Sequence, residues 1–363
     1  MKEHKLRKTL FQLFTLGILM FVTYYLIMRD QEFEDVWQVI TSTNKLCLIA
    51  GMVLMALFVF CGGFACKVLM EGMHHNLTIG QCFKYSLVDF YFSSITPSNT
   101  GGQPMELIYM KHDGYPVVDS SVVLLAVTVL GRVALLTVSA IMFAISLPFV
   151  ASRAVAVLPF AILGFVANLI LISFLLIVLF SKKLTQVIVN FTVKILGKLH
   201  LIKDQEETKR EVAKKLSHYH ECSIFFFEHK KLVLKAFGVL MVQRLSLLSV
   251  TYMTYIALGL NEYTYFEITA IQCLLNLCTD LMPLPGAVGI TETVFLMLFA
   301  PIFTEAKVTT AVLLSRGISF YLVLIVSALF IFGYRLYSIV KGNKMGKNVT
   351  FEDADDEQLE DEL

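Results

Sequence analysis

Long runs of apolar residues, separated by shorter polar connections, make up most of this chain of 363 residues. A membrane-spanning helix needs about 20 predominantly apolar residues, and runs of this length with few charges are typical of such helices. Six runs meet the requirement: Thr9–Met28, Leu46–Met70, Val118–Leu147, Ala154–Phe180, Leu232–Leu260 and Thr309–Tyr337. The pattern predicts an all-α integral membrane protein built as a polytopic helical bundle.

Two further apolar regions are interrupted by residues that break helices. Gln81–Met110 contains "TPSNTGGQP", and Phe266–Ala300 contains "DLMPLPGAVGITE". The halves on either side of each break are short for a complete span. We therefore expect two re-entrant helical hairpins, or pairs of short tilted helices, beside the six full spans. Hydropathy alone is compatible with six to eight crossings.

Composition supports the membrane class. The chain is 56% hydrophobic and only 16% charged, against about 25% charged residues in an average soluble domain. The seven cysteines include no CxxC pair. An odd number of cysteines, mostly in apolar runs, predicts reduced thiols and no disulfide framework.

The positions of lysine and arginine predict the orientation, because cytoplasmic loops carry an excess of both. The N-terminal segment "MKEHKLRK", the loop 181–231 and the segment after the last span are all basic. Both termini are therefore expected in the cytoplasm, with the first hairpin entering from that side and the second from outside. We expect one membrane domain over residues 1–347, with 181–231 as a basic amphipathic cytoplasmic loop. Residues 348–363 form an acidic tail that is expected to be disordered.

The two broken regions share an order of residues. In each, an aspartate precedes a Pro/Gly break, a glutamate follows it, and the next span carries an arginine: Asp89, Glu106 and Arg132 in the first, Asp280, Glu292 and Arg316 in the second. In the expected topology the two units face opposite ways. Corresponding broken segments of this kind are a sign of the inverted repeats found in many transporters.

These charges lie at membrane depth together with Arg244. A central charge costs at least about 2.5–3.5 kcal/mol, so such residues usually face a partner or a wet pathway. Arginine suits a phosphate because its planar fork donates two hydrogen bonds, and carboxylates suit an amine. The residues could instead form the structural ion pairs Glu106–Arg132 and Glu292–Arg316, and Glu106 could cap its own helix. Both interpretations stay open.

Other candidate chemistry is weak. The stretch "SHYHEC" offers His218, His220, Glu221 and Cys222. The two histidines are two residues apart, which does not place them on one helix face. We expect no metal ion, no other cofactor and no catalytic residue.

The two breaks resemble the signatures of the lysylphosphatidylglycerol synthase transmembrane family, "TP…GG.P.E" and "P.PGG.G..E". The matching positions are Thr96, Pro97, Gly101, Gly102, Pro104 and Glu106, then Pro283, Pro285, Gly286, Gly289 and Glu292. Ala287 departs from the pattern, because it stands where the second glycine of "PGG" is usual. The family includes the flippase half of the bacterial multiple peptide resistance factor.

This resemblance implies a protein of the bacterial plasma membrane that moves an aminoacylated phospholipid, such as lysylphosphatidylglycerol, between leaflets. The implied partners are the phospholipid and the membrane, with a separate lipid-modifying enzyme or a second copy of the chain as further candidates, and no nucleic acid. One alternative is an enzyme, either a phosphatidylglycerol lysyltransferase or a partner in lipid-linked glycosyl transfer. Another is a docking or regulatory subunit that uses the loop 181–231.

Overall fold

The structure is a computed structural model, and it describes residues 33–153, 158–181, 218–280 and 282–340. These residues form helices and no strands. The first half comprises α2 (Phe33–Ser42), α3 (Lys45–Gly72), α4 (Ile79–Ile95), the 3₁₀ turn η1 (Pro97–Asn99), α5 (Gly102–His112), α6 (Val117–Ile145), α7 (Leu147–Arg153) and α8 (Leu158–Phe180).

The second half has a similar plan after a short helix over residues 218–228. It comprises α11 (Lys230–Ala257), α12 (Tyr265–Thr279), the 3₁₀ turn η2 (Pro285–Ala287), α13 (Ile290–Phe303), α14 (Glu305–Arg316), the π-helical segment η3 (Gly317–Leu322) and α15 (Val323–Val340). Each half therefore has a long helix, a broken hairpin and a further long helical segment.

Six helical segments of the described chain are long and apolar enough to cross a membrane. Five of them confirm predicted spans: Lys45–Gly72, Val117–Ile145, Leu158–Phe180, Lys230–Ala257 and Lys307–Tyr334. The sixth, Pro285–Phe303, contains η2 and α13, so it belongs to the second broken region. The predicted first span, Thr9–Met28, the tail 348–363 and most of the loop 181–231 lie outside the described residues.

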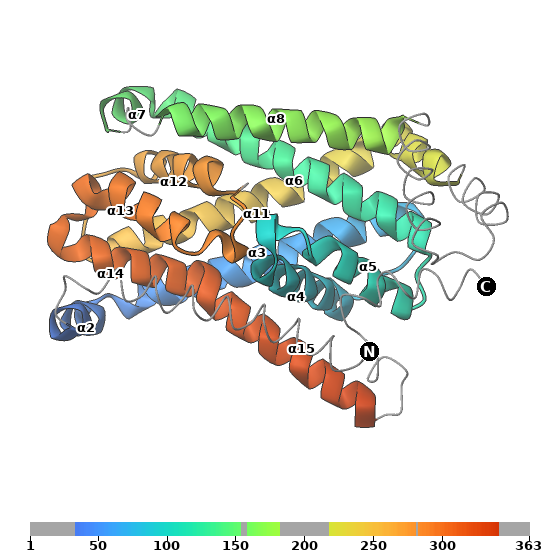
Figure 1. Ribbon diagram of the computed structural model, residues 1–363, viewed down its shortest axis with the longest axis horizontal. Coiled ribbons are helices and arrows are strands. Elements are labelled where there is room, and N and C mark those ends of the chain that lie inside the picture. Colours follow the sequence, from blue (N-terminus) through green and yellow to red (C-terminus); the bar gives the residue numbers. More distant parts are fainter. Residues whose placement is uncertain (1–32, 154–157, 182–217, 281, 341–363) are drawn as a thin grey trace, which may run out of the picture.

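The two broken regions are helical hairpins that enter the bundle from opposite ends. In Figure 1, α4 and α5 come from the end at which α5 turns into α6, and α12 and α13 come from the end that carries α7. Their tips, η1 and η2, lie against each other near the middle of the bundle. The hairpins are thus re-entrant and inverted, as expected from the sequence.

Both hairpins start and turn by the same local chemistry. Thr78 and Gln81 form a capping box at the start of α4, and Thr264 and Glu267 form one at the start of α12, which satisfies free N–H groups of the first turn. Each tip is a Pro-initiated 3₁₀ turn with two successive residues at positive φ, Ser98–Asn99 and Gly286–Ala287. Ala287 therefore adopts the left-handed conformation although it replaces a glycine of the family pattern.

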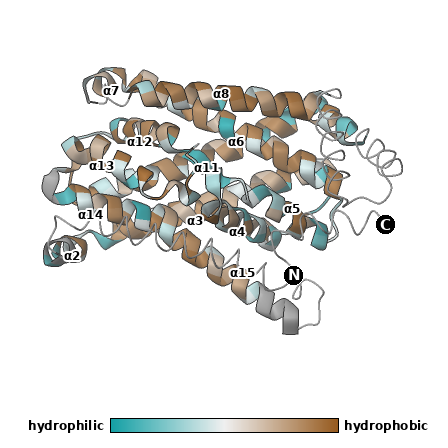
Figure 2. Cartoon of the chain, viewed as in Figure 1, coloured by the Kyte–Doolittle hydropathy of each residue, from teal (hydrophilic) through white to brown (hydrophobic). Residues whose placement is uncertain are grey.

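Close helix packing holds the hairpins against the long helices. A Cβ on Gly63 of α3 would lie 2.0 Å from the carbonyl oxygen of Cys82 in α4, and one on Gly164 of α8 would lie 2.0 Å from that of Leu277 in α12. Small residues allow this backbone approach in membranes, where van der Waals packing drives helix association. Figure 2 shows α8 apolar along most of its length, which suits a helix that faces lipid.

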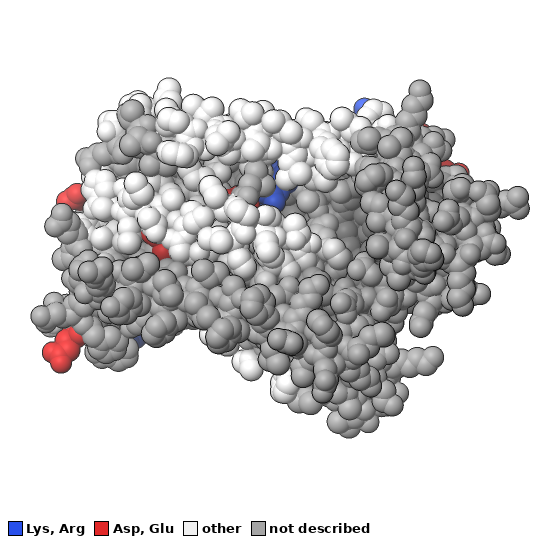
Figure 3. Space-filling view, in the orientation of Figure 1, with Lys and Arg blue, Asp and Glu red and all other residues white. Residues whose placement is uncertain are grey.

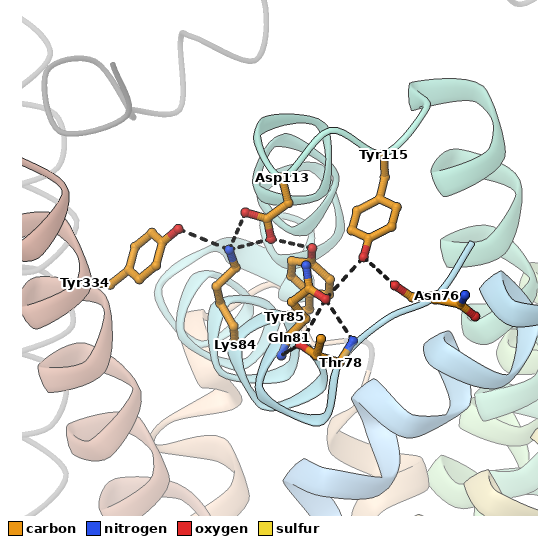
Figure 4. A network of polar contacts seen from close by, with 8 residues as sticks. All are labelled: Asn76, Thr78, Gln81, Lys84, Tyr85, Asp113, Tyr115 and Tyr334. Atoms are coloured by element: carbon orange, nitrogen blue, oxygen red, sulfur yellow. Dashed lines mark hydrogen bonds and ion pairs between the residues drawn. The ribbon is translucent and has the colours of Figure 1, made fainter. Parts of the chain in front are cut away.

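A buried lysine joins the first hairpin to the last helix. The ammonium group of Lys84 (α4) lies 2.5 Å from the carboxylate of Asp113, at the end of α5, and donates a hydrogen bond to Tyr334 of α15 at 3.2 Å. Tyr85 donates a second hydrogen bond to Asp113 at 2.5 Å (Figure 4). Because the charges of Lys84 and Asp113 are paired and hydrogen-bonded, this network fixes the base of the hairpin, well away from its tip.

Candidate functional site

A cavity of about 360 Å³ lies where the two hairpin tips meet. Its lining comes from both halves of the chain: α3, α4, α5, α6, α11, α12, α13, α14, η3 and both breaks. Six charged residues line it: Asp89, Glu106, Arg132, Arg244, Asp280 and Arg316. The charged positions that the sequence predicts as substrate contacts are therefore gathered in one place, except Glu292, which lies directly behind Arg316.

The cavity lies at the middle depth of the bundle. Arg132 is at the centre of α6 (Val117–Ile145) and Arg244 at the centre of α11 (Lys230–Ala257). On the face shown in Figure 3, few of the described side chains are charged, but a basic side chain beside an acidic one is visible in a central hollow. A charged side chain at this depth is costly unless it has a partner or faces water. We therefore expect water or a polar ligand in the hollow.

Arg132 bridges the two repeats. Its guanidinium pairs with the carboxylate of Asp280, at the end of α12, and donates a hydrogen bond to the Asn168 amide oxygen of α8 at 3.3 Å. The structural alternative in the sequence paired Arg132 with Glu106, and that pairing is wrong. The partner comes from the other hairpin because the inverted halves place the end of α12 beside the middle of α6.

The second break is closed by its own glutamate. Glu292 is only 2% exposed; one carboxylate oxygen accepts a hydrogen bond from the backbone N–H of Gly289 at 2.7 Å, which caps α13. The other oxygen accepts from Arg316 Nε at 2.8 Å and from the Tyr321 hydroxyl at 3.1 Å. Arg316 also donates to the Gly286 carbonyl at 3.2 Å. The expected Glu292–Arg316 pair is confirmed, and it holds the break in shape.

The glutamate of the first break, Glu106, does not make the corresponding contacts. Glu106 is 6% exposed and lies in the second turn of α5, whose N-terminus has no side-chain cap. The suggestion that Glu106 caps its helix is therefore wrong. Within the described chain, no hydrogen bond or ion pair joins its carboxylate to another residue. The two glutamates thus follow the same order in the sequence but stand at different helical positions.

Arg244 differs from Arg132 and Arg316, because no ion pair with a carboxylate is described for it. Among the described residues, its Nε is buried and has no hydrogen-bond partner. A buried donor without an acceptor costs about 1–3 kcal/mol, and more when the group is charged. Such a group is expected to find its acceptor in whatever enters the cavity.

The remaining predicted residues shape the breaks. Thr96 accepts a hydrogen bond from the Gly101 N–H at 2.9 Å, and its own hydroxyl donates to the Phe92 carbonyl at 2.7 Å. Pro97 and Pro285 begin the two 3₁₀ turns, Gly101 and Gly289 are N-caps, and Pro104 lies in the first turn of α5. Of the predicted glycines, only Gly286 lines the cavity itself.

Several uncharged polar residues of the cavity are not singled out by the sequence. Thr251 donates a hydrogen bond to Gln272 at 2.9 Å and lies 3.0 Å from Ser315, and Gln272 donates to Asn276 at 3.2 Å. Gln243 also lines the cavity. In the sequence, each of these residues is an amide or hydroxyl side chain within an apolar run. Polar residues that only pack between helices show the same pattern, so the sequence does not distinguish the two.

Gly102 is expected to tolerate no side chain. A Cβ there would lie 2.2 Å from Asp89 Oδ1 and 2.6 Å from the Asp89 carbonyl oxygen. Gly102→Ala should therefore destabilise the protein by about 1–3 kcal/mol through overpacking. The midpoint of thermal unfolding in detergent measures this.

Gly238 provides the control, because it is also helical and a Cβ there meets nothing within 4 Å. Gly238→Ala should be neutral or stabilising, since alanine is the better helix former. Equal midpoints for the two variants would show that the start of α5 does not pack closely on Asp89 of α4.

Taken together, the fold and the site define a multi-pass membrane protein with two inverted re-entrant hairpins around a charged central cavity. The family described as the lysylphosphatidylglycerol synthase TM region matches residues 10–327, and the chain belongs to this family. It is also 23% identical over 284 residues to a "UPF0104 membrane protein" of Archaeoglobus fulgidus, covering 76% of this chain and 82% of the relative.

Proposed function

We propose that this protein moves a phospholipid head group across the bilayer through the cavity between the hairpin tips. The observation that carries the proposal is the meeting of three arginines and three carboxylates at the middle depth of an apolar bundle. A charged head group cannot cross hydrocarbon rapidly because it loses its hydration, and a polar cavity lowers that cost.

The pairing of charges favours a head group that has both signs. Arg132 is paired with Asp280, and Arg316 with Glu292. Arg244, Asp89 and Glu106 form no ion pair among the described residues, although the Ser93 hydroxyl donates a hydrogen bond to Asp89 at 3.5 Å, and these three charges are proposed to contact the substrate. Arg244 suits the phosphate, and the carboxylates of Glu106 and Asp89 suit an amine. An aminoacylated phospholipid such as lysylphosphatidylglycerol supplies both groups.

Transport requires the cavity to open toward each leaflet in turn. The two tips lie against each other and belong to inverted halves, and in such folds one half rocks against the other around a fixed site. The end of the bundle where α5 turns into α6 is proposed to face the cytoplasm, with both termini on that side. The acyl chains would stay in lipid beside the hollow seen in Figure 3.

The function is tested in liposomes that contain the purified protein and fluorescent lysylphosphatidylglycerol, with a membrane-impermeant quencher reporting outward movement. We expect faster exposure of the lipid than in protein-free liposomes. Glu106→Gln removes the negative charge that is expected to contact the amine, and should slow translocation at least tenfold.

Glu262→Gln is the matched control, because Glu262 is exposed at the loop before α12. Translocation at the protein-free rate would contradict the proposal. Formation of aminoacylated lipid from charged tRNA and phosphatidylglycerol, without translocation, would favour the lysyltransferase alternative instead.

A further inference from the structure

A second cluster of reactive side chains lies far from the cavity, at the end of the bundle where α5 turns into α6. Asp119, in the first turn of α6, His218 and Cys222 each offer one ligand atom, and these atoms all lie within 4.8 Å of one another. His75, in the connection after α3, contacts the same aspartate. Three segments that are far apart in the sequence therefore meet at one carboxylate.

Two of the three distances between these ligand atoms are close to those of a metal site. Cys222 Sγ lies 3.6 Å from Asp119 Oδ1 and 3.7 Å from His218 Nε2. A tetrahedral zinc ion with bonds of about 2.0–2.3 Å separates its ligand atoms by about 3.3–3.6 Å. The remaining edge, from Asp119 Oδ1 to His218 Nε2, is 2.8 Å, and it would open by about half an ångström when a cation replaces the shared proton.

The supporting contacts also fit. His75 Nε2 lies 2.6 Å from Asp119 Oδ2, so it holds the oxygen that does not face the cation. Such outer contacts orient a ligand and raise metal affinity. Asp119 and Cys222 are buried, whereas the His218 side chain is 54% exposed. The site is therefore anchored from inside and open to solvent on one side, which leaves a fourth position for water.

We propose that Asp119, His218 and Cys222 bind a divalent transition-metal ion, zinc by preference, with His75 as the positioning residue for Asp119. A nitrogen, a sulfur and an oxygen ligand in tetrahedral arrangement favour zinc over magnesium or calcium, which prefer oxygen alone. The ion ties the helix over residues 218–228, which directly precedes α11, to the start of α6. Its role is thus to join the two halves at this end of the bundle.

The sequence did not indicate this site because Asp119 and Cys222, two of its ligands, are 103 positions apart. His218 and His220, two residues apart, pointed away from metal binding. The residue that shares the face of His218 is Cys222, four positions later. Asp119 and His75 join them only through the packing of α6 against the connection after α3.

The test is the zinc content of the full-length protein, purified without a histidine tag and dialysed against micromolar zinc, measured by inductively coupled plasma mass spectrometry. We expect about one zinc per chain, and at least a tenfold lower content in Cys222→Ser and His218→Asn. Cobalt substitution should give thiolate-to-metal charge-transfer absorption that Cys222→Ser abolishes. His75→Asn should weaken zinc affinity about 10–100-fold.

Two variants serve as matched controls: Cys47→Ser, at a partly exposed cysteine, and His74→Asn, at the residue beside His75. Both should keep the zinc. His218→Asn changes an exposed side chain, so its effect is independent of any folding defect in Cys222→Ser. Zinc below one tenth of an equivalent in the unmodified protein would overturn the proposal, as would equal zinc in His218→Asn and His74→Asn.

Discussion

Replacing Arg244 with glutamine is expected to slow lipid translocation at least tenfold while leaving the protein folded. The buried Nε of Arg244 has no partner among the described residues, so the variant loses no internal hydrogen bond of that atom. It does lose the charged contact with the phosphate that the proposed mechanism assigns to Arg244. Truncating one partner of a buried charged pair typically costs about 2–5 kcal/mol, and each 1.4 kcal/mol or so is a factor of ten.

Arg244→Lys separates charge from geometry. Lysine keeps the positive charge but lacks the planar fork that donates two hydrogen bonds to one phosphate, so an intermediate rate is expected. Lys235→Gln is the control on the same helix, because Lys235 is exposed. The measurement is the liposome assay, with the elution profile of each variant as the check on folding. Normal translocation by Arg244→Gln would remove Arg244 from the proposed site.

Glu292→Gln is expected to cause a large loss of stability, about 3–5 kcal/mol. The substitution leaves the guanidinium of Arg316, whose side chain is only 13% exposed, without its charged partner, and unpaired charges at such low exposure are costly. A glutamine side chain has one acceptor oxygen, so it can accept from Arg316 or from the Gly289 N–H but not from both; Arg316 also keeps its hydrogen bond to Gly286 and its positions over the Phe320 and Tyr321 rings. The thermal midpoint in detergent should fall steeply.

Glu267 gives a matched control for this effect. It caps α12 through the backbone N–H of Thr264 at 2.8 Å, as Glu292 caps α13, but no ion pair to an arginine is described for it. Glu267→Gln should therefore cost only about 1 kcal/mol. The double variant Glu292→Gln with Arg316→Met should recover much of the loss, because a buried pair can often be replaced by apolar residues. If both glutamine variants lowered the midpoint equally, Glu292 would be a cap alone.

The corresponding residues of the two halves make different contacts. In the second half, glutamate and arginine are bound to each other and to the break. In the first, Arg132 is paired across to Asp280, and Glu106 lines the cavity without a described partner. We infer that the second hairpin is the fixed half of the site and that the first contributes the carboxylate for the substrate.

Sequence alone was enough to predict the membrane class, five described spans, both broken hairpins and their inverted arrangement. These follow from local physics: apolar runs must be helical in lipid because every backbone group needs a partner, and Pro and Gly end helices wherever they occur. The Glu292–Arg316 pair was also predicted correctly, because α14 follows α13 after a single residue and returns alongside it. The family signatures led to the same segments.

Tertiary structure decided which charges are partners. Arg132 could have met Glu106, its neighbour in the repeat, and instead meets Asp280 from the other hairpin. The sequence also did not reveal that Arg244 Nε lacks a partner or that Glu106 lies beyond the first turn of α5. Nor did it reveal that four residues meet at one end of the bundle: His75, Asp119, His218 and Cys222. The physical reason is that apolar periodicity fixes the depth of a residue in the membrane, whereas its partners depend on how the helices rotate and pack against one another.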